Sequence, residues 1–266
     1  MLSAAELDAC AALMDELAEW AMVRIVAERP TPDQVDTKSW AADWVTETDL
    51  AVERFARAAI AERFPGHRII GEEFGTTGAD DAPATWLIDP VDGTTNYVHE
   101  LPISSFSICV TDERGAAAGL VADPYRREVL SAVRGRGALR NGSPTRCSEA
   151  TTLMGGIVLT EFASQALWDG MVDLMEALST AGCVTRIPGS NAFSVSSVAT
   201  GRAVATVIGH FGAGDCLAGA LIAEEAGARI LAPSSPPRDG ERFVCAAPGV
   251  VDELLRVWPE APAVAA

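Results

Sequence analysis

Two carboxylates stand three positions apart in residues 89–96, which read DPVDGTTN. The apolar run at 86–88 that precedes them is typical of a short buried strand. A proline between the aspartates and a glycine after them predict a tight bend that presents Asp89 and Asp92 together. Carboxylate oxygens bind hard divalent cations, and the backbone N–H groups of Gly93 and Thr94 suit a phosphate group. The segment therefore predicts a metal-and-phosphate site.

Acidic residues also stand at the ends of two other predicted elements. Glu72 follows a strand at 68–71, and Asp215 begins a helix after the glycine-rich residues 209–214. Taken singly, each has a structural explanation, because Glu-Glu pairs are common in solvated loops and aspartate commonly caps helices. Taken together, carboxylates from three junctions are what a Mg²⁺ site needs. A metal-activated water would then make a protein nucleophile unnecessary for phosphoryl transfer.

The overall charge limits the possible partners. The 266 residues include 20 Lys and Arg and 37 Asp and Glu, so the formal net charge is −17. Such a chain repels nucleic acids and anionic membranes, and we expect neither as a partner. No apolar stretch approaches the roughly 20 residues that cross a bilayer, and the first residues lack the pattern of a signal peptide. We expect a cytoplasmic protein.

The cysteines and histidines argue against two other classes of hydrolase. The six cysteines are widely spaced without a C-x-x-C pair, which favours free buried thiols over disulfides or zinc ligands. The three histidines are not at metal-ligand spacing, and no G-x-S-x-G motif is present. A zinc hydrolase and a serine hydrolase therefore have little support.

Hydrophobic periodicity predicts two halves of different architecture within one domain over residues 1–266. The part up to about residue 150 reads as two helices on a largely antiparallel sheet, with capping-box spacing at 46–49 and a hairpin turn at 141–142. The part from 151 to 258 alternates strands and helices, as in an α/β sheet, and 259–266 form a tail. The predicted helices are 4–28, 46 or 48 to 64, 165–180, 192–200, 215–225 and 250–257. The predicted strands are 68–71, 86–88, 104–110, 116–122, 128–133, 157–160, 184–187, 203–208, 228–231 and 243–246.

These motifs, taken in chain order, resemble those of the inositol monophosphatase family of magnesium-dependent, lithium-sensitive phosphatases. The matching segments are TETD at 46–49, GEE at 71–73, DPVDGTTN at 89–96, GD at 214–215, AG at 218–219 and EAG at 225–227. The correspondence runs from about residue 38 to 227, and the octapeptide is highly specific. The resemblance implies a layered α-β-α-β-α sandwich of the sugar-phosphatase type, combining α+β and α/β parts. It also implies a homodimer and two or three Mg²⁺ ions.

The resemblance also implies roles for individual residues. The metal ligands would be Glu72, Asp89, the carbonyl of Val91, Asp92 and Asp215. The residues that orient and activate the attacking water would be Asp49 and Thr94, with Glu72 and Lys38 also catalytic. The substrate would contact Asp92, the amides of Gly93 and Thr94, Thr95, Gly189, Ser190 and Asn191.

Two of these assignments have independent support or a competing explanation. Lys38 is the only lysine, so the other 19 of the 20 lysines and arginines are arginines. The compact ammonium group of a lysine suits a point contact to phosphate or water. A stray exposed lysine is the competing explanation. Residues 189–191 stand at a strand-to-helix junction, where short polar side chains suit hydroxyl recognition or an ordinary helix cap.

The chain departs from the family pattern at two positions near the third motif. Gly214 stands where the family usually has tryptophan, and Ile208 replaces a glutamate that contacts inositol hydroxyls in family members. An aliphatic side chain accepts no hydrogen bond from a hydroxyl, so the catalytic set is kept while inositol phosphate itself is placed in doubt. His210 could take over the ring contact, or it could be a solvent-facing loop residue.

The combined hypothesis is a Mg²⁺-dependent phosphomonoesterase that hydrolyses a small polyol, cyclitol or amino-alcohol phosphate by metal-activated water. A histidinol-phosphate or sugar-phosphate phosphatase with the same mechanism is the first alternative. An interaction or regulatory protein that retains the fold is the second, and the intact set of acidic residues argues against it.

Overall fold

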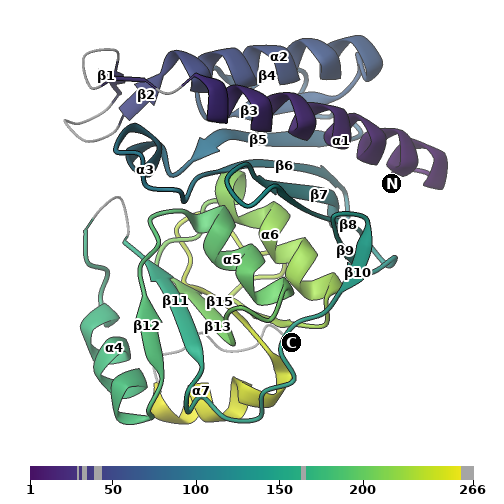
Figure 1. The fold of residues 1–266 in the computed structure, drawn as a ribbon. Coiled ribbons are helices and arrows are strands. Elements are labelled where there is room, and N and C mark those ends of the chain that lie inside the picture. The colour runs from purple at the N-terminus through teal and green to yellow at the C-terminus, as the bar shows by residue number, and fades with distance from the viewer. Residues whose placement is uncertain (29, 32–34, 39–43, 163–165, 259–266) are drawn as a thin grey trace.

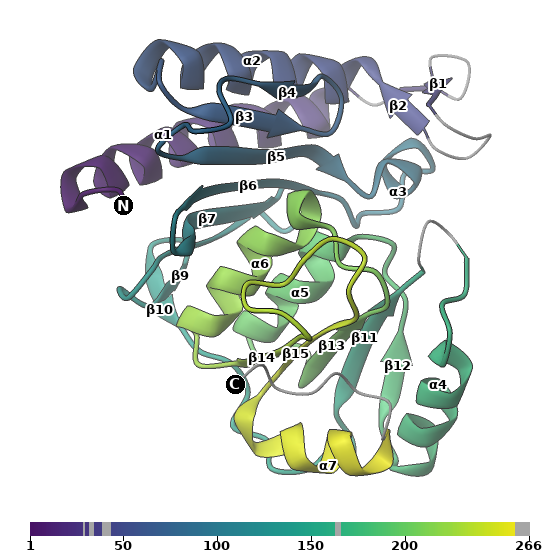
Figure 2. The same ribbon diagram turned by 180° about the vertical axis from the view of Figure 1, so that it is seen from behind.

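Helices and sheets alternate in five layers in the computed structural model of the chain (Figures 1 and 2). The structure describes residues 1–28, 30–31, 35–38, 44–162 and 166–258. Helices α1 (Ala4–Ala27) and α2 (Glu47–Arg63) cover one face of an eight-stranded sheet. Helices α5 (Asn191–Ala199) and α6 (Ala213–Glu225) lie between this sheet and a five-stranded sheet, whose other face carries α4 (Met171–Thr180) and α7 (Val251–Val257). The predicted α-β-α-β-α sandwich is confirmed.

The eight-stranded sheet is antiparallel except where β3 (Arg68–Gly71) runs parallel to β5 (Thr85–Asp92). The strand order is β10-β9-β8-β7-β6-β5-β3-β4. Side chains alternate between its faces: Trp86 and Ile88 pack against α1 and α2, whereas Leu87 packs against α5 and α6. The other strands are β4 (Gly75–Thr77), β6 (Ser105–Asp112), β7 (Gly115–Asp123), β8 (Glu128–Val133), β9 (Ala138–Arg140) and β10 (Ser143–Thr145).

The five-stranded sheet is mixed, with the order β12-β11-β13-β15-β14. β11 (Ile157–Glu161) runs parallel to both β12 (Val184–Arg186) and β13 (Ala205–Ile208). β15 (Phe243–Ala246) is antiparallel to β13 and to β14 (Arg229–Leu231). Because α4 and α5 connect successive parallel strands, the C-terminal ends of β11 and β12 meet at one edge of the sheet.

Two details differ from the sequence-based expectation. The helix predicted from residue 165 begins only at Met171, because Gly170 precedes it with a positive φ of 85° that is incompatible with the helix. Residue 165 and the tail at 259–266 lie outside the described residues. Strand β5 continues through Pro90. A proline cannot donate a hydrogen bond to a neighbouring strand, so it is found in a central strand only where the strand pairing is irregular. The pairing shifts between Asp89 and Asp92, so Pro90 falls at this irregularity.

Short elements complete the described chain. A hairpin of β1 (Val35–Thr37) and β2 (Trp44–Thr46) precedes α2, α3 (Thr94–Val98) follows β5, and a 3₁₀ turn (Pro248–Val250) precedes α7. All six cysteines are free, as predicted. Among the described helices, none has the length and apolar character needed to cross a membrane.

Candidate active site

The segments selected from the sequence meet at one cavity of about 920 Å³. Its lining includes residues of β5 and α3 in the N-terminal layers, residues at the end of β11 and after β12, and residues of the first turns of α5 and α6. Lys38 and Asp49 lie behind this lining and reach it through hydrogen bonds to Glu72 and Thr94. The other selected residues all line the cavity: Glu72, Asp89, Val91, Asp92, Gly93, Thr94, Thr95, Gly189, Ser190, Asn191, His210 and Asp215.

The bend between β5 and α3 depends on a glycine. Gly93 has a φ of +89°, and a Cβ placed there would lie 3.0 Å from the carbonyl oxygens of both Gly189 and Ile103. After this bend, the Thr94 hydroxyl lies 3.0 Å from the Val91 carbonyl oxygen and 3.2 Å from Asp49 Oδ1. It can donate to either acceptor, because a hydroxyl has one proton. The bend therefore connects β5 to the buried carboxylate of α2.

Asp92 joins the two halves of the chain. Its carboxylate accepts hydrogen bonds from the Ser190 hydroxyl and from the backbone N–H groups of Asn191 (3.1 Å) and Ala192 (2.7 Å) at the start of α5. Burial raises the pKa of Asp92 well above its ordinary value, and the charge of Asp215 raises it further. The helix N-terminus thus holds one oxygen-rich side of the cavity in place.

Asp215 and Asp89 complete the group of carboxylates whose charges repel one another. Asn191 Nδ2 donates to Asp215 Oδ2 at 2.6 Å, while burial raises the pKa of Asp215 to about 6. The pKa of Asp89 is raised well above its ordinary value, first by burial and then by the charges of Glu72, Asp92 and Asp215. These mutual effects show that acidic groups from three distant segments share one electrostatic environment.

Lys38 forms ion pairs beside this group of carboxylates. Its Nζ lies 2.7 Å from Glu72 Oε1 and 2.6 Å from Glu73 Oε1. Burial raises the pKa of Glu73 to about 7, against the lowering effect of its hydrogen bond with Lys38. The single lysine of the sequence is an exposed residue, and its ammonium is paired with Glu72, which lines the cavity, and with Glu73.

Asp49 is fully buried at the first turn of α2. The predicted capping box is confirmed: the Thr46 N–H and hydroxyl both donate to Asp49 Oδ2, and the Asp49 N–H lies 3.4 Å from the Thr46 hydroxyl. Burial raises the pKa of Asp49 to about 6, and the hydrogen bond from Thr46 opposes this shift. Asp49 Oδ1 lies 3.2 Å from the Thr94 hydroxyl oxygen, so this buried carboxylate of raised pKa stands next to the bend after β5.

The donor set fits a hard divalent cation. Glu72, Asp89, Asp92, Asp215 and the Val91 carbonyl offer only oxygen atoms, as Mg²⁺ prefers. Within the described ranges, no three His, Cys, Asp or Glu side chains are already drawn together at the spacing of a bound metal. The convergence is therefore seen in the shared cavity and in the raised pKa values, which burial causes first and the repulsion between the carboxylates second. A bound cation would offset both effects.

Glu53 is a functional candidate that the sequence analysis missed. Its side chain is fully buried and accepts from the backbone N–H groups of Glu73 (2.7 Å) and Phe74 (3.1 Å) and from Arg57 Nε (2.6 Å). A Cβ on Gly71 would lie 2.0 Å from Glu53 Oε1, so only glycine fits beside it. Glu53 thus fixes the turn that carries Glu72. Its position one helical turn after Asp49 was the available signal.

We expect Glu53→Gln to raise the Mg²⁺ concentration that gives half-maximal activity about tenfold, the effect of losing a residue that orients a ligand. The amide is uncharged and has only one accepting oxygen, so it cannot accept from both backbone N–H groups and pair with the Arg57 guanidinium. The melting temperature should therefore also fall. Magnesium titration of activity and thermal melting measure the two effects. Glu47→Gln, at an exposed position of the same helix, is the matched control. An unchanged magnesium requirement in Glu53→Gln would contradict this role.

Glu161 is a second residue that the sequence analysis missed. The end of β11 brings it under residues 189–194, where its carboxylate accepts from the Gly189 N–H (2.8 Å) and the Ser194 hydroxyl (2.5 Å). Burial raises its pKa to about 7. Its sequence context is an apolar strand followed by Phe162, which gives no functional signal. Its carboxylate therefore holds the Gly189–Ser190 segment in place through these two hydrogen bonds.

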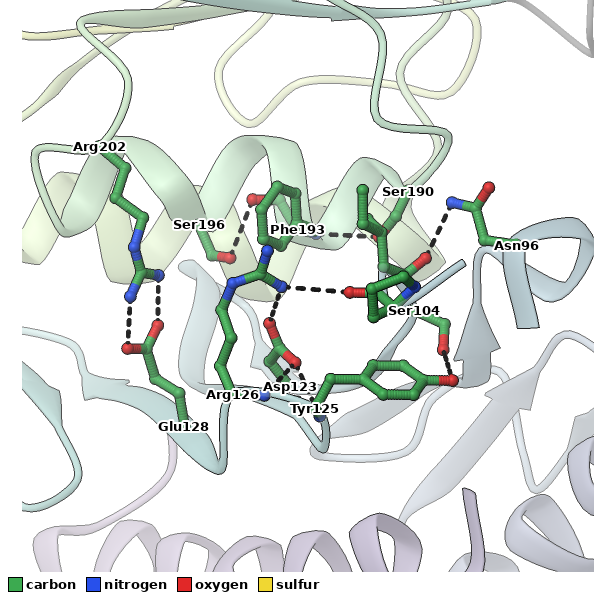
Figure 3. A network of polar contacts seen from close by, with 12 residues as sticks. Asn96, Ser104, Asp123, Tyr125, Arg126, Glu128, Ser190, Phe193, Ser196 and Arg202 are labelled. Atoms are coloured by element: carbon green, nitrogen blue, oxygen red, sulfur yellow. Dashed lines mark hydrogen bonds and ion pairs between the residues drawn. The ribbon is translucent and has the colours of Figure 1, made fainter. Parts of the chain in front are cut away.

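Polar contacts beside the cavity hold α5 against the eight-stranded sheet (Figure 3). Asn96 Nδ2 lies 2.8 Å from the carbonyl oxygens of both Ile103 and Pro188, joining α3 to the segment before α5. Arg126 lies over the Phe193 ring at 4.8 Å and donates to Asp123 (2.7 Å), and Arg202 pairs with Glu128. Because these contacts come from both halves, the position of Ser190 relative to Asp92 is set by the tertiary structure.

Comparison with known proteins identifies the class. The model of the inositol monophosphatase family matches residues 6–258. An inositol monophosphatase from Mesembryanthemum crystallinum is 33% identical over 229 residues, covering 82% of this chain and 84% of that protein. An inositol-1-monophosphatase from Mycobacterium bovis is 37% identical over 233 residues, covering 83% and 80%. The structure of an inositol monophosphatase from Anabaena (Nostoc) sp. has a TM-score of 0.83 at 28% identity, covering 97% and 98%.

Fold and sequence together define a phosphoric monoester hydrolase. The chain belongs to the inositol monophosphatase family.

Proposed function

We propose that the protein hydrolyses phosphate monoesters of small alcohols with Mg²⁺ as its cofactor, using two or three ions. One observation carries the proposal: the carboxylates of Glu72, Asp89, Asp92 and Asp215 reach a single cavity from three segments of the chain, where burial and then the charges of neighbouring carboxylates raise the pKa values of the three aspartates. Such mutual repulsion is stabilised when cations bind among the carboxylates. When bound, Mg²⁺ supplies an acidified water and neutralises charge on the phosphate.

The protein groups around this cavity have distinct proposed roles. The backbone N–H groups of Gly93 and Thr94 bind the phosphate oxygens at the bend after β5. Thr94 orients the attacking water, and its hydroxyl passes a proton toward Asp49, whose pKa of about 6 suits a proton acceptor near neutral pH. Lys38 holds Glu72 and Glu73, and Asp92 is held by the start of α5.

The proposed substrates are small polyol, cyclitol or amino-alcohol phosphates, and histidinol phosphate or a sugar phosphate is the alternative within the same chemistry. The relatives named above are inositol phosphatases, which supports a cyclitol ester among the substrates. His210, exposed at the cavity, and the segment Gly189–Asn191 are the proposed contacts to the alcohol. We further propose a cytoplasmic homodimer, and light scattering on the purified protein tests its assembly.

Phosphate release from a panel of small esters, measured with Mg²⁺ and with EDTA, tests the proposed activity. We expect release from at least one ester that depends on Mg²⁺ and stops in EDTA. Turnover that persists in EDTA would contradict the metal-dependent mechanism. Absence of turnover on every ester would contradict the activity itself.

The raised pKa values of Asp49 and Asp215, both about 6 against an ordinary 3.8, predict how pH affects the stability of the metal-free protein. At pH values between the unfolded pKa and the folded pKa of these groups, the folded state binds more protons than the unfolded state. The free energy of unfolding therefore falls as pH rises from about 4 to about 6. In EDTA we expect a melting temperature at least about 5 °C lower at pH 7 than at pH 5. Mg²⁺ should restore stability at pH 7 and have a much smaller effect at pH 5, because it binds the ionised carboxylates. Equal stabilisation by Mg²⁺ at both pH values in thermal melting would contradict this linkage.

A further inference from the structure

Asp239 is a carboxylate of the cavity lining that the proposed metal site does not use. It lies on the loop between β14 and β15, which runs beside the start of α6 (Figure 2). Asp239 Oδ1 accepts from the backbone N–H of Ala213 at 2.8 Å, and the proposed metal ligand Asp215 follows two residues later. Asp239 is exposed, and within the described ranges its second oxygen accepts no hydrogen bond and forms no ion pair.

The loop that carries Asp239 is held against the loop that precedes α6. The Gly240 N–H donates to the Phe211 carbonyl, and the Phe211 N–H donates to the Glu241 carbonyl, both at 2.8 Å. The ring of Phe211 is buried against Phe243, with 5.1 Å between the ring centroids. Asp239 is therefore fixed in position before a substrate binds, which lowers the entropy cost of recognising one.

The other free or acidic oxygen atoms of the lining outside the proposed metal set are engaged or covered. Glu161 accepts from the Gly189 N–H and from the Ser194 hydroxyl. Asn191 Oδ1 has no donor in the part of the chain that the structure describes, but protein atoms cover it. Asp239 is thus the accessible carboxylate that remains for a part of the substrate other than its phosphate.

The charges of the lining indicate which group Asp239 binds. Among the described residues that line the cavity, none is a lysine or an arginine. An ionised carboxylate accepts hydrogen bonds and donates none, so Asp239 repels the phosphate group and suits a donor. A hydrogen bond from a hydroxyl or an ammonium group to a carboxylate is stronger than one between neutral groups.

We propose that Asp239 is a specificity residue that accepts a hydrogen bond from a hydroxyl or ammonium group on the alcohol of the phosphate ester. This inference rests on the proposed phosphatase activity and specifies how that site recognises the alcohol. An alcohol without such a donor takes water away from Asp239 without replacing its hydrogen bonds, which costs free energy. Because Asp239 and Asp215 are both fixed at the start of α6, the bound donor group also orients the ester relative to the metal site.

The test compares kcat/KM for two matched pairs of esters at one saturating Mg²⁺ concentration. Inositol 1-phosphate is paired with cyclohexyl phosphate, and 2-aminoethyl phosphate is paired with ethyl phosphate, so the members of a pair differ in the donor groups of the alcohol. We expect the wild-type protein to favour the donor-bearing ester of at least one pair by about tenfold or more, the scale of one hydrogen bond to a charged group. The pair that shows this preference identifies the donor as a hydroxyl or an ammonium group.

Asp239→Asn tests the residue itself. Its amide oxygen can still accept from the Ala213 N–H, but an NH₂ group, which only donates, replaces the free oxygen. The ratio of kcat/KM within the preferred pair should fall about tenfold, and any loss common to both esters cancels in this ratio. Asp239→Ala should lower the ratio in the same way. Asp80→Asn, which removes an exposed carboxylate outside the cavity lining, should keep the wild-type ratio.

The outcomes separate this inference from the proposed function. Equal kcat/KM within both wild-type pairs, or a ratio unchanged in both Asp239→Asn and Asp239→Ala, would overturn the role of Asp239 while the Mg²⁺-dependent activity stands. An unchanged ratio with an equal loss on both esters would show that Asp239 only supports the start of α6. Failure to hydrolyse any of the four esters with Mg²⁺ would overturn the proposed function, and the role of Asp239 with it.

Discussion

Asp92→Asn is expected to lower kcat for phosphate release about 10³-fold, equivalent to about 4 kcal/mol of transition-state stabilisation. The amide keeps an oxygen that can accept from the start of α5, but it removes a negative charge from the proposed metal site. The pKa of Asp92 is raised in the folded protein, so its ionised form destabilises the metal-free state. The amide also replaces one of the two accepting oxygens, and this loss opposes the gain from removing the buried charge. The melting temperature of Asp92→Asn in EDTA at pH 7 should therefore stay close to that of the wild type.

This combination of lost activity and retained stability distinguishes a functional carboxylate from a structural one. Phosphate-release kinetics and thermal melting in EDTA are the two measurements. Asp80→Asn removes a carboxylate whose side chain is 93% exposed, and it should leave both quantities unchanged. Wild-type turnover in Asp92→Asn would remove the basis for a metal site. A large loss of stability would indicate that Asp92 serves chiefly to join the two halves.

Gly93→Ala has the second largest expected effect, a fall in kcat/KM of about 10²-fold. A Cβ at this position is strained in two ways: alanine disfavours a φ of +89°, and the Cβ would lie 3.0 Å from the carbonyl oxygens of Gly189 and Ile103. The left-handed conformation alone costs about 1–2 kcal/mol. The close contacts would move the bend away from α5 and shift the proposed phosphate-binding N–H groups, and displacements of about 1 Å cost activity heavily.

The chain offers a matched control for the conformational part of this effect. Gly142 also has a positive φ, of +74°, and a Cβ there would meet no atom within 4 Å. Gly142→Ala should lower the melting temperature slightly and leave kcat/KM at the wild-type value. If Gly93→Ala behaved like Gly142→Ala in phosphate release, the bend after β5 would have no special role in binding phosphate.

The sequence predicted the elements well where local patterns decide them. The capping box at Thr46 and Asp49, strands 68–71, 128–133 and 243–246, and the hairpin turn at 141–142 all follow from short-range rules, and the structure confirms them. Prediction failed where a single conformation overrides the pattern. Gly170 delays α4, and the irregular pairing around Pro90 lets a segment that looked like a bend complete β5.

The candidate site was less predictable wherever a role depends on a neighbour distant in the chain. Asp89, Asp92 and Asp215 carry recognisable local signals, whereas Glu53 looks like an ordinary helix glutamate until the turn after β3 donates two N–H groups to it. Glu161 likewise acquires its partners only when residues 189–194 lie above β11.

The sequence by itself determined the chemical inventory of this protein: oxygen ligands in three ordered motifs, a glycine at the bend after β5, a single lysine and the alternation of helices and strands. Only the tertiary structure decided that these groups share one cavity and that burial, together with the charges of neighbouring carboxylates, raises the pKa values of three aspartates. The physical reason is that hydrogen bonding and periodicity act over a few residues. Desolvation and Coulomb repulsion instead depend on distance in space, which only the packing of the two sheets around α5 and α6 sets.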